Sequence, residues 1–76
     1  MFDRIVSNPA ILGGKPIVRG TRISVELILE WIASGATRDG ILRKRPHLST
    51  ADLEQALAYA ASAIRNEVLV AAEVGA

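Results

Sequence analysis

Residues 13–23 read GGKPIVRGTRI and stand directly ahead of a well-marked helix start. They hold three glycines, one proline and three cations. Glycine permits backbone conformations that a Cβ forbids, and proline lacks a donor N–H, so this composition excludes an ordinary helix and favours short extended pieces. The sequence after the stretch has helical periodicity. One domain over residues 1–76 is therefore predicted, with a β arm in residues 1–23 and a helical part in residues 24–76.

The arm contains two further short apolar pieces. Residues 2–6, followed by Asn8-Pro9, predict a short strand that ends at a turn. Residues 10–12 form the second piece, and Gly13-Gly14 predicts that it turns back on residues 16–19 as a hairpin or a bulged extended arm. An irregular arm is the alternative. Since a two-stranded ribbon is marginal in water, we expect the arm to pack on the helices or to pair with another chain.

The first helix is marked at both ends. Ser24 is a good N-cap and Gly35 a good stop, so a helix is predicted from about Val25 to Ser34. Its apolar positions cover a wider arc than one core face requires, which predicts a central helix with two neighbours. Trp31 is interpreted as a core residue in preference to a ligand-stacking one.

Two more helices follow, each with its own cap. Thr37 predicts a short helix through Arg45, ended by Pro46. Ser49 predicts a third helix, with Asp52 completing a weak capping box, and no helix breaker occurs before Gly75. The apolar stripe of this helix is predicted to bury these residues: Leu53, Ala56, Leu57, Ala60, Ile64, Val68 and Ala71. Those predicted to face away are Glu54, Gln55, Ala58, Ser62 and Arg65.

The end of the third helix has a different pattern. Residues 68–72 read VLVAA and are apolar nearly all round, which in a monomer would expose apolar surface. Either this end frays or it docks on another chain, and docking is favoured. Because 76 residues support only a small core, association would also stabilise the domain.

Composition limits the function classes. The chain has no cysteine, which excludes disulfides and thiolate chemistry, and its formal net charge of +1 neither demands nor excludes nucleic acid. No apolar run suggests a signal peptide or a membrane span, so a cytoplasmic protein is expected. The one histidine, His47, has no partner at metal-ligand spacing, and the carboxylates are scattered. We therefore expect no enzyme, no metal site and no cofactor.

Several motifs together resemble a known family. They are Asn8-Pro9, the sequence GKPIVRGTRI of residues 14–23, Gly35 after an apolar helix, and the spacing of Ile41-Leu42, Pro46 and Leu48-Ser49. Over about residues 4–61 the chain resembles the antitoxin-like family catalogued as domain of unknown function 433. The resemblance implies a mainly α, three-helix homeodomain-like (helix-turn-helix) bundle with a short N-terminal β-hairpin or strand arm. Arg45 departs from the family, in which an aromatic often precedes the proline.

The resemblance also implies a function. Such a protein is usually a homodimer, is often encoded beside a PIN-like ribonuclease toxin, neutralises that toxin, and can repress the shared operon by binding operator DNA. A homodimeric interaction module without DNA binding is the alternative. At the start of the third helix Asp52 and Glu54 have the wrong sign for phosphates, and only Gln55 offers a base-edge contact. DNA contacts are therefore predicted at Lys15, Arg19, Arg22, Arg43, Lys44 and Arg45, and toxin contacts at Arg19, Arg22, Val68, Leu69 and Val70.

Overall fold

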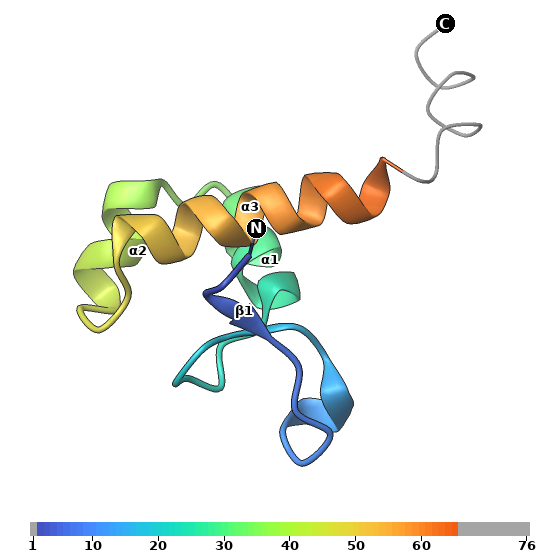
Figure 1. Ribbon diagram of the computed structural model, residues 1–76. Helices are drawn as coiled ribbons and strands as arrows, with labels where there is room; N and C mark the ends of the chain where they lie inside the picture. Colours follow the sequence, from blue (N-terminus) through green and yellow to red (C-terminus); the bar gives the residue numbers. More distant parts are fainter. Residues whose placement is uncertain (1, 66–76) are drawn as a thin grey trace, which may run out of the picture.

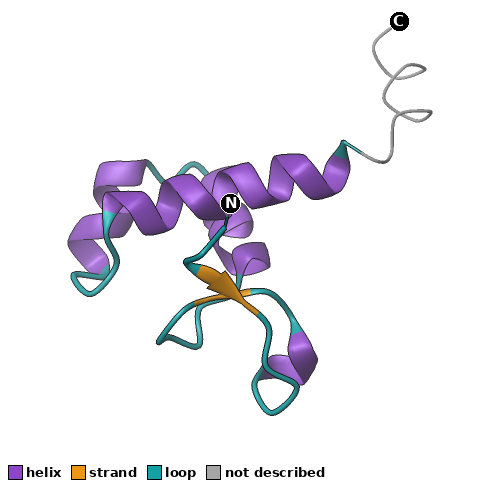
Figure 2. Cartoon of the chain, viewed as in Figure 1, coloured by secondary structure: helices purple, strands orange, loops and turns teal. Residues whose placement is uncertain are grey.

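The computed structural model describes residues 2–65 of the chain. It contains three helices, α1 (Val25–Ala33), α2 (Arg38–Lys44) and α3 (Thr50–Ile64), preceded by the short strands β1 (Ile5–Val6) and β2 (Ile17–Val18). The long α3 lies across the other two helices, and the arm lies beside α1 and touches α3 through β1 (Figure 1). The predicted fold class, mainly α with an N-terminal hairpin, is confirmed (Figure 2).

The pairing of the arm differs from the prediction. β1 pairs with β2 in antiparallel register, Ile5 opposite Val18 and Val6 opposite Ile17. Residues 10–12 are not a strand, because the side-chain oxygen of Asn8 accepts a hydrogen bond from the N–H of Ala10 and begins a turn there. A 3₁₀ turn, Leu12–Gly14, follows and completes the reversal. The hairpin predicted between residues 10–12 and 16–19 is therefore wrong, although the first strand and the turn at Pro9 are confirmed.

β2 is the centre of the arm. On one side it pairs with β1, and on the other it forms a bridge between Ile17 and Ser24, with the N–H of Val18 donating to the carbonyl of Ile23. Ile17 and Val18 are almost completely buried. This double pairing lets a strand of two residues pack as part of the core, which a free ribbon could not do.

The three predicted helix caps are all present. The hydroxyls of Ser24, Thr37 and Ser49 accept from the backbone N–H three residues further on, at 3.0, 3.0 and 3.1 Å. Gly35 has a φ of 101° and ends α1 as predicted, because a left-handed residue there redirects the chain. α2 ends at Lys44, one residue before the predicted end.

The core lies between the helices and β2. Ile28 in α1 and Leu53 in α3 are fully buried, and each such side chain contributes about 1.5–3 kcal/mol by leaving water. The rest of the wide apolar arc of α1, Trp31 included, is only partly buried against this core. The buried residues of the cluster are Val18, Val25, Ile28, Ile41, Leu48, Leu53, Ala56 and Ala60.

α3 departs from its predicted burial at three positions. Ile64 is 61% exposed, since the last described turn of α3 extends past α1, so its predicted core position is wrong for the single chain. Gln55 and Ser62 are partly buried, although both were expected to face outward. Asp52, predicted as the capping-box residue, is buried. The predicted continuation of the helix to Ala72 lies outside the described residues, as do Val68, Leu69, Val70 and Ala71. None of the described helices is both long and apolar enough to cross a membrane.

Candidate functional site

The most defined polar feature of the arm is the turn between β2 and α1, residues 19–22, which we call the arginine turn. Gly20 takes a φ of 78°, which L side chains rarely adopt. The hydroxyl of Thr21 donates to the carbonyl of Val18 at 2.8 Å and accepts from the N–H of Ile23 at 2.9 Å. The N–H of Thr21 also donates to the carbonyl of Val18, at 3.0 Å. These three bonds fix the backbone between the two arginines.

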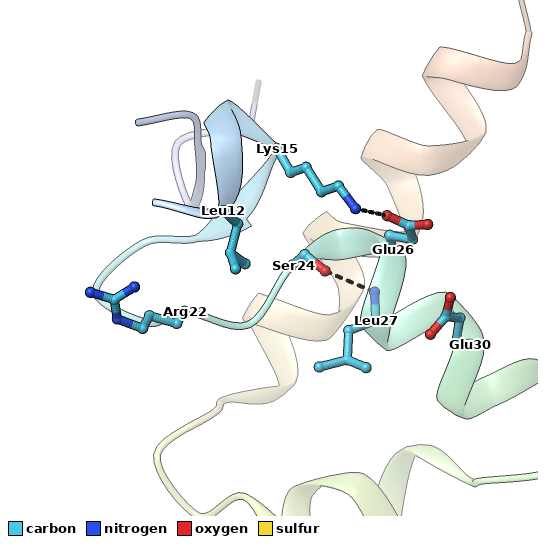
Figure 3. A pocket seen from close by; sticks show the side chains of 7 residues that line it. All are labelled: Leu12, Lys15, Arg22, Ser24, Glu26, Leu27 and Glu30. Atoms are coloured by element: carbon cyan, nitrogen blue, oxygen red, sulfur yellow. Dashed lines mark hydrogen bonds and ion pairs between the residues drawn. The ribbon is translucent and has the colours of Figure 1, made fainter. Parts of the chain in front are cut away.

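Arg19 and Arg22 are both exposed on this fixed turn. Neither has an ion-pair partner among residues 2–65. Arg22 stands between two hollows, one of about 380 Å³ against α1 and one of about 400 Å³ against β1 and Ile11. Figure 3 shows its guanidinium pointing away from the acidic side chains of α1. The turn thus presents two guanidinium groups that are available to an acidic partner.

Lys15 is in a different state from the two arginines. Its Nζ lies 2.8 Å from Oε1 of Glu26 in α1, and both side chains are more than half exposed (Figure 3). The hydrogen bond to Glu26, together with the negative charge of that carboxylate, raises the pKa of Lys15 above its usual 10.5. Lys15 is therefore paired within the chain, and a phosphate would have to compete with Glu26 for its charge.

The remaining predicted cations lie at the end of α2. Arg43, Lys44 and Arg45 are all exposed, and the first two lie in the last helical turn, where positive charge suits the helix dipole. The guanidinium carbon of Arg45 lies 5.0 Å from the ring centroid of Trp31. The sequence pattern did not predict this cation–π contact, since it joins a residue of α1 to the residue that follows α2. Lys15 and Arg22 line one hollow, and Lys44 and Arg45 line another.

The start of α3 is not available as a DNA-reading surface. Asp52 is buried, its Oδ2 accepting from the N–H of Ser49 at 2.9 Å and its Oδ1 pairing with Arg4 at 3.2 Å. Gln55 accepts from the N–H of Arg4 at 2.9 Å and donates to Asp3 at 2.8 Å. The single base-edge candidate is thus occupied within the fold. Of the polar side chains considered at this helix start, Glu54 remains exposed, and its charge repels phosphate.

The bonds of Asp3 and Arg4 to Asp52 and Gln55 attach the arm to α3. The hydrogen bond from Gln55, with the nearby charges of Arg4 and Arg19, lowers the pKa of Asp3 below its usual 3.8. The signal for this attachment was present in the sequence, because Asp52 stands three residues after Ser49 and Gln55 three residues after Asp52, on one face of a helix. Their partners on the arm could not be identified from spacing.

Catalytic groups are sparse in the part of the chain that the structure describes. Across residues 2–65, no group of three or more histidine, cysteine, aspartate or glutamate side chains is arranged to hold a metal ion. His47 is exposed in the connection between α2 and α3. The charged and apolar surfaces described above are therefore the features on which a function can be argued.

Comparison with known proteins identifies the family. A family model described as a protein of unknown function, DUF433, matches residues 5–60. The chain belongs to the DUF433 family. The predicted resemblance over residues 4–61 is thereby confirmed, and the match includes both strands of the arm, the arginine turn and most of α3.

Two relatives are similar to this DUF433 member. An uncharacterized protein of Sinorhizobium fredii is 38% identical over 56 residues, which cover 74% of this chain and 25% of that protein. The chain thus spans about a quarter of the length of this curated relative. The crystal structure of a DUF433 member from Anabaena variabilis matches with a TM-score of 0.77 at 27% identity, covering 97% of this chain and 70% of that one. The arrangement of arm and helices is therefore shared with a solved member of the family.

Proposed function

We propose that this DUF433 protein is the antitoxin of a type II toxin–antitoxin pair, which binds and silences a PIN-like ribonuclease encoded beside it. The observation that carries the proposal is the arginine turn, where Arg19 and Arg22 are exposed on a backbone held by Thr21. The family resemblance supplies the class of partner. Binding of this kind is reversible protein recognition and needs no cofactor.

The chemistry of the two surfaces is complementary. Nucleases of the PIN-like class hold metal ions with clustered carboxylates, and a planar guanidinium pairs with a carboxylate through two parallel hydrogen bonds. Because the backbone of the turn is fixed before binding, the conformational entropy lost when its arginines enter an acidic cleft is confined to their side chains. An inserted Arg19 or Arg22 would compete with the metal for the acids and so stop cleavage.

The predicted apolar contact of the tail belongs to the same proposal. Val68, Leu69 and Val70 lie outside the described residues and keep their predicted role on the basis of sequence alone. They would add buried apolar area to an interface whose charged part is the arginine turn. A homodimer in the cytoplasm would bring two such turns to one complex.

Co-purification and binding measurements with the neighbouring nuclease test the proposal. Arg19→Ala and Arg22→Ala should each weaken binding by about tenfold to a hundredfold, since a hydrogen bond to a charged group contributes about 1.5–3 kcal/mol. Arg38→Ala is the matched control, because Arg38 is an exposed arginine on α2 away from the turn. Removal of residues 67–76 should also weaken binding. Unchanged affinity of the Arg19→Ala, Arg22→Ala double variant would refute the role of the turn.

A second candidate function is operator binding, favoured by the exposed cations Arg43 and Lys44 in addition to those of the arginine turn. With few phosphate contacts per subunit, binding would be weak and would fall steeply with salt. Electrophoretic shifts of the native upstream DNA at about 50 and 200 mM salt test this. A shift at low salt that Arg43→Ala weakens would support it, and the absence of any shift at low salt would exclude it.

A further inference from the structure

A hollow that the proposed antitoxin function does not use lies between the end of α1 and α2. It has a volume of about 260 Å³ and lies beside the cation–π pair of Trp31 and Arg45. Its lining consists of the apolar residues Trp31, Ala36 and Ile41, of Thr37 and Gly40, and of the cations Lys44 and Arg45. Among residues 2–65, no carboxylate belongs to its lining. The hollow therefore combines apolar side chains with two positive charges.

The glycine in this wall is costly for the helix. Gly40 lies inside α2, where glycine is about 1 kcal/mol less favourable than alanine. A Cβ at this position would lie 3.1 Å from Oγ1 of Thr37, the atom that caps the helix. A side chain there would press on the cap and take up space in the hollow. The sequence thus keeps a residue that weakens α2 and leaves the hollow open.

The two cations of the hollow, Lys44 and Arg45, can bind an anion. Stacking on Trp31 restricts the guanidinium of Arg45, so its N–H groups lose less freedom when they bind a ligand. Lys44 is exposed beside it. Within residues 2–65, the ion pairs are Arg4 with Asp52 and Lys15 with Glu26, so neither Lys44 nor Arg45 is neutralised there.

We propose that this hollow binds a carboxylate side chain that is flanked by an aliphatic side chain on a partner protein. The carboxylate would bridge Arg45 and Lys44, and the aliphatic group would pack against Ile41 and the uncovered part of Trp31. The occupant is thus an acidic and apolar peptide segment. It contacts the opposite end of α1 from Ser24 and the arginine turn, so the two sites are separate parts of the surface.

A nucleic acid fits these observations less well. Nucleotides bound as single strands stack their bases on open aromatic faces, whereas a guanidinium already stacks on Trp31. Phosphate binding also gains strength from many cations, and this hollow has two, with a formal net charge of only +1 for the whole chain. Charge and shape together favour a single carboxylate beside an aliphatic group.

The single tryptophan of the chain makes the test direct, because Trp31 fluorescence reports from the wall of the hollow. The probe is the N-acetyl dipeptide amide leucyl-glutamate, with its leucyl-glutamine counterpart as the uncharged control at equal ionic strength. We expect saturable quenching by the glutamate probe with a Kd on the order of 1 mM, and a response at least about fivefold weaker from the glutamine probe.

Three variants test whether the glutamate probe binds in this hollow. Lys44→Met keeps the stem and the Trp31 stack but removes a charge, and it should weaken the glutamate probe about fivefold or more. Arg45→Met should do the same, judged by the titration and after circular dichroism has established folding. Arg38→Met, outside the hollow, should leave the titration unchanged. If Arg45→Met does not fold, Lys44→Met decides.

Other results of these titrations would contradict the carboxylate site. Equal response to the two dipeptides, or no difference between Lys44→Met and the wild-type protein, would overturn the carboxylate site. Quenching by a short oligouridylate but not by the glutamate probe would assign the hollow to nucleic acid instead. Because these titrations use no nuclease and leave Arg19 and Arg22 intact, their failure is distinguishable from failure of the proposed antitoxin function.

Discussion

Replacement of Asp52 by alanine should cost more stability than its position near a helix start suggests. The carboxylate closes the capping box with Ser49 and pairs with Arg4, and Asp52 is only 8% exposed. Loss of the capping interaction costs about 1 kcal/mol. The ion pair adds about 0.5 kcal/mol, discounted because the Arg4 side chain is 45% exposed. The sum, about 1.5 kcal/mol, predicts a Tm lower by about 6–12 °C.

Thermal unfolding followed by circular dichroism measures this effect. Asp52→Asn keeps an acceptor oxygen for the N–H of Ser49 and should lose only about a third of that stability, since mainly the pairing with Arg4 is weakened. Glu54→Ala, an exposed change in the same helical turn, is the control and should shift Tm by less than about 3 °C. Equal Tm values for Asp52→Ala and Glu54→Ala would contradict a stabilising role of the Asp52 carboxylate.

Two other predictions concern the arm. Gly20→Ala forces a Cβ into a φ of 78° with no neighbour within 4 Å, so its cost is conformational alone, about 1 kcal/mol, measured as a lower denaturant midpoint with unchanged slope. An unchanged midpoint would contradict the left-handed turn. The pKa of Asp3 is lowered by its hydrogen bond to Gln55, so its stabilisation is present above the usual pKa of 3.8 and is lost as pH falls through the lower folded value. The Tm difference between the wild-type protein and Asp3→Asn should therefore narrow on acidification. A difference that widens would contradict the lowered pKa of Asp3 in the folded protein.

Much of the helical fold followed from local chemistry. Ser24, Thr37 and Ser49 predicted three helix starts correctly, because an N-cap depends on residues within one turn. The position of the stop at Gly35 followed for the same reason. The partner of β1 could not be predicted in this way, since strand pairing depends on packing across the whole arm.

The candidate sites were predictable to a similar extent. The exposure of Arg19 and Arg22 followed from the composition of the stretch around them, but the role of Thr21 in holding the turn required the backbone geometry. The stacking of Arg45 on Trp31 and the burial of Asp52 are long-range results of how the helices pack. Sequence spacing contains no direct record of such contacts.

The attachment of the arm to α3 has a consequence for synthesis of the chain. Arg4 bonds to Asp52 and Gln55, partners 48 and 51 residues further along the sequence. Contacts between such distant residues form late, and a chain is made from its N-terminus. A copy that ends before Asp52 therefore lacks the residues that hold its arm against α3, so we expect the arginine turn to take its final position relative to α3 only after Gln55 has been made.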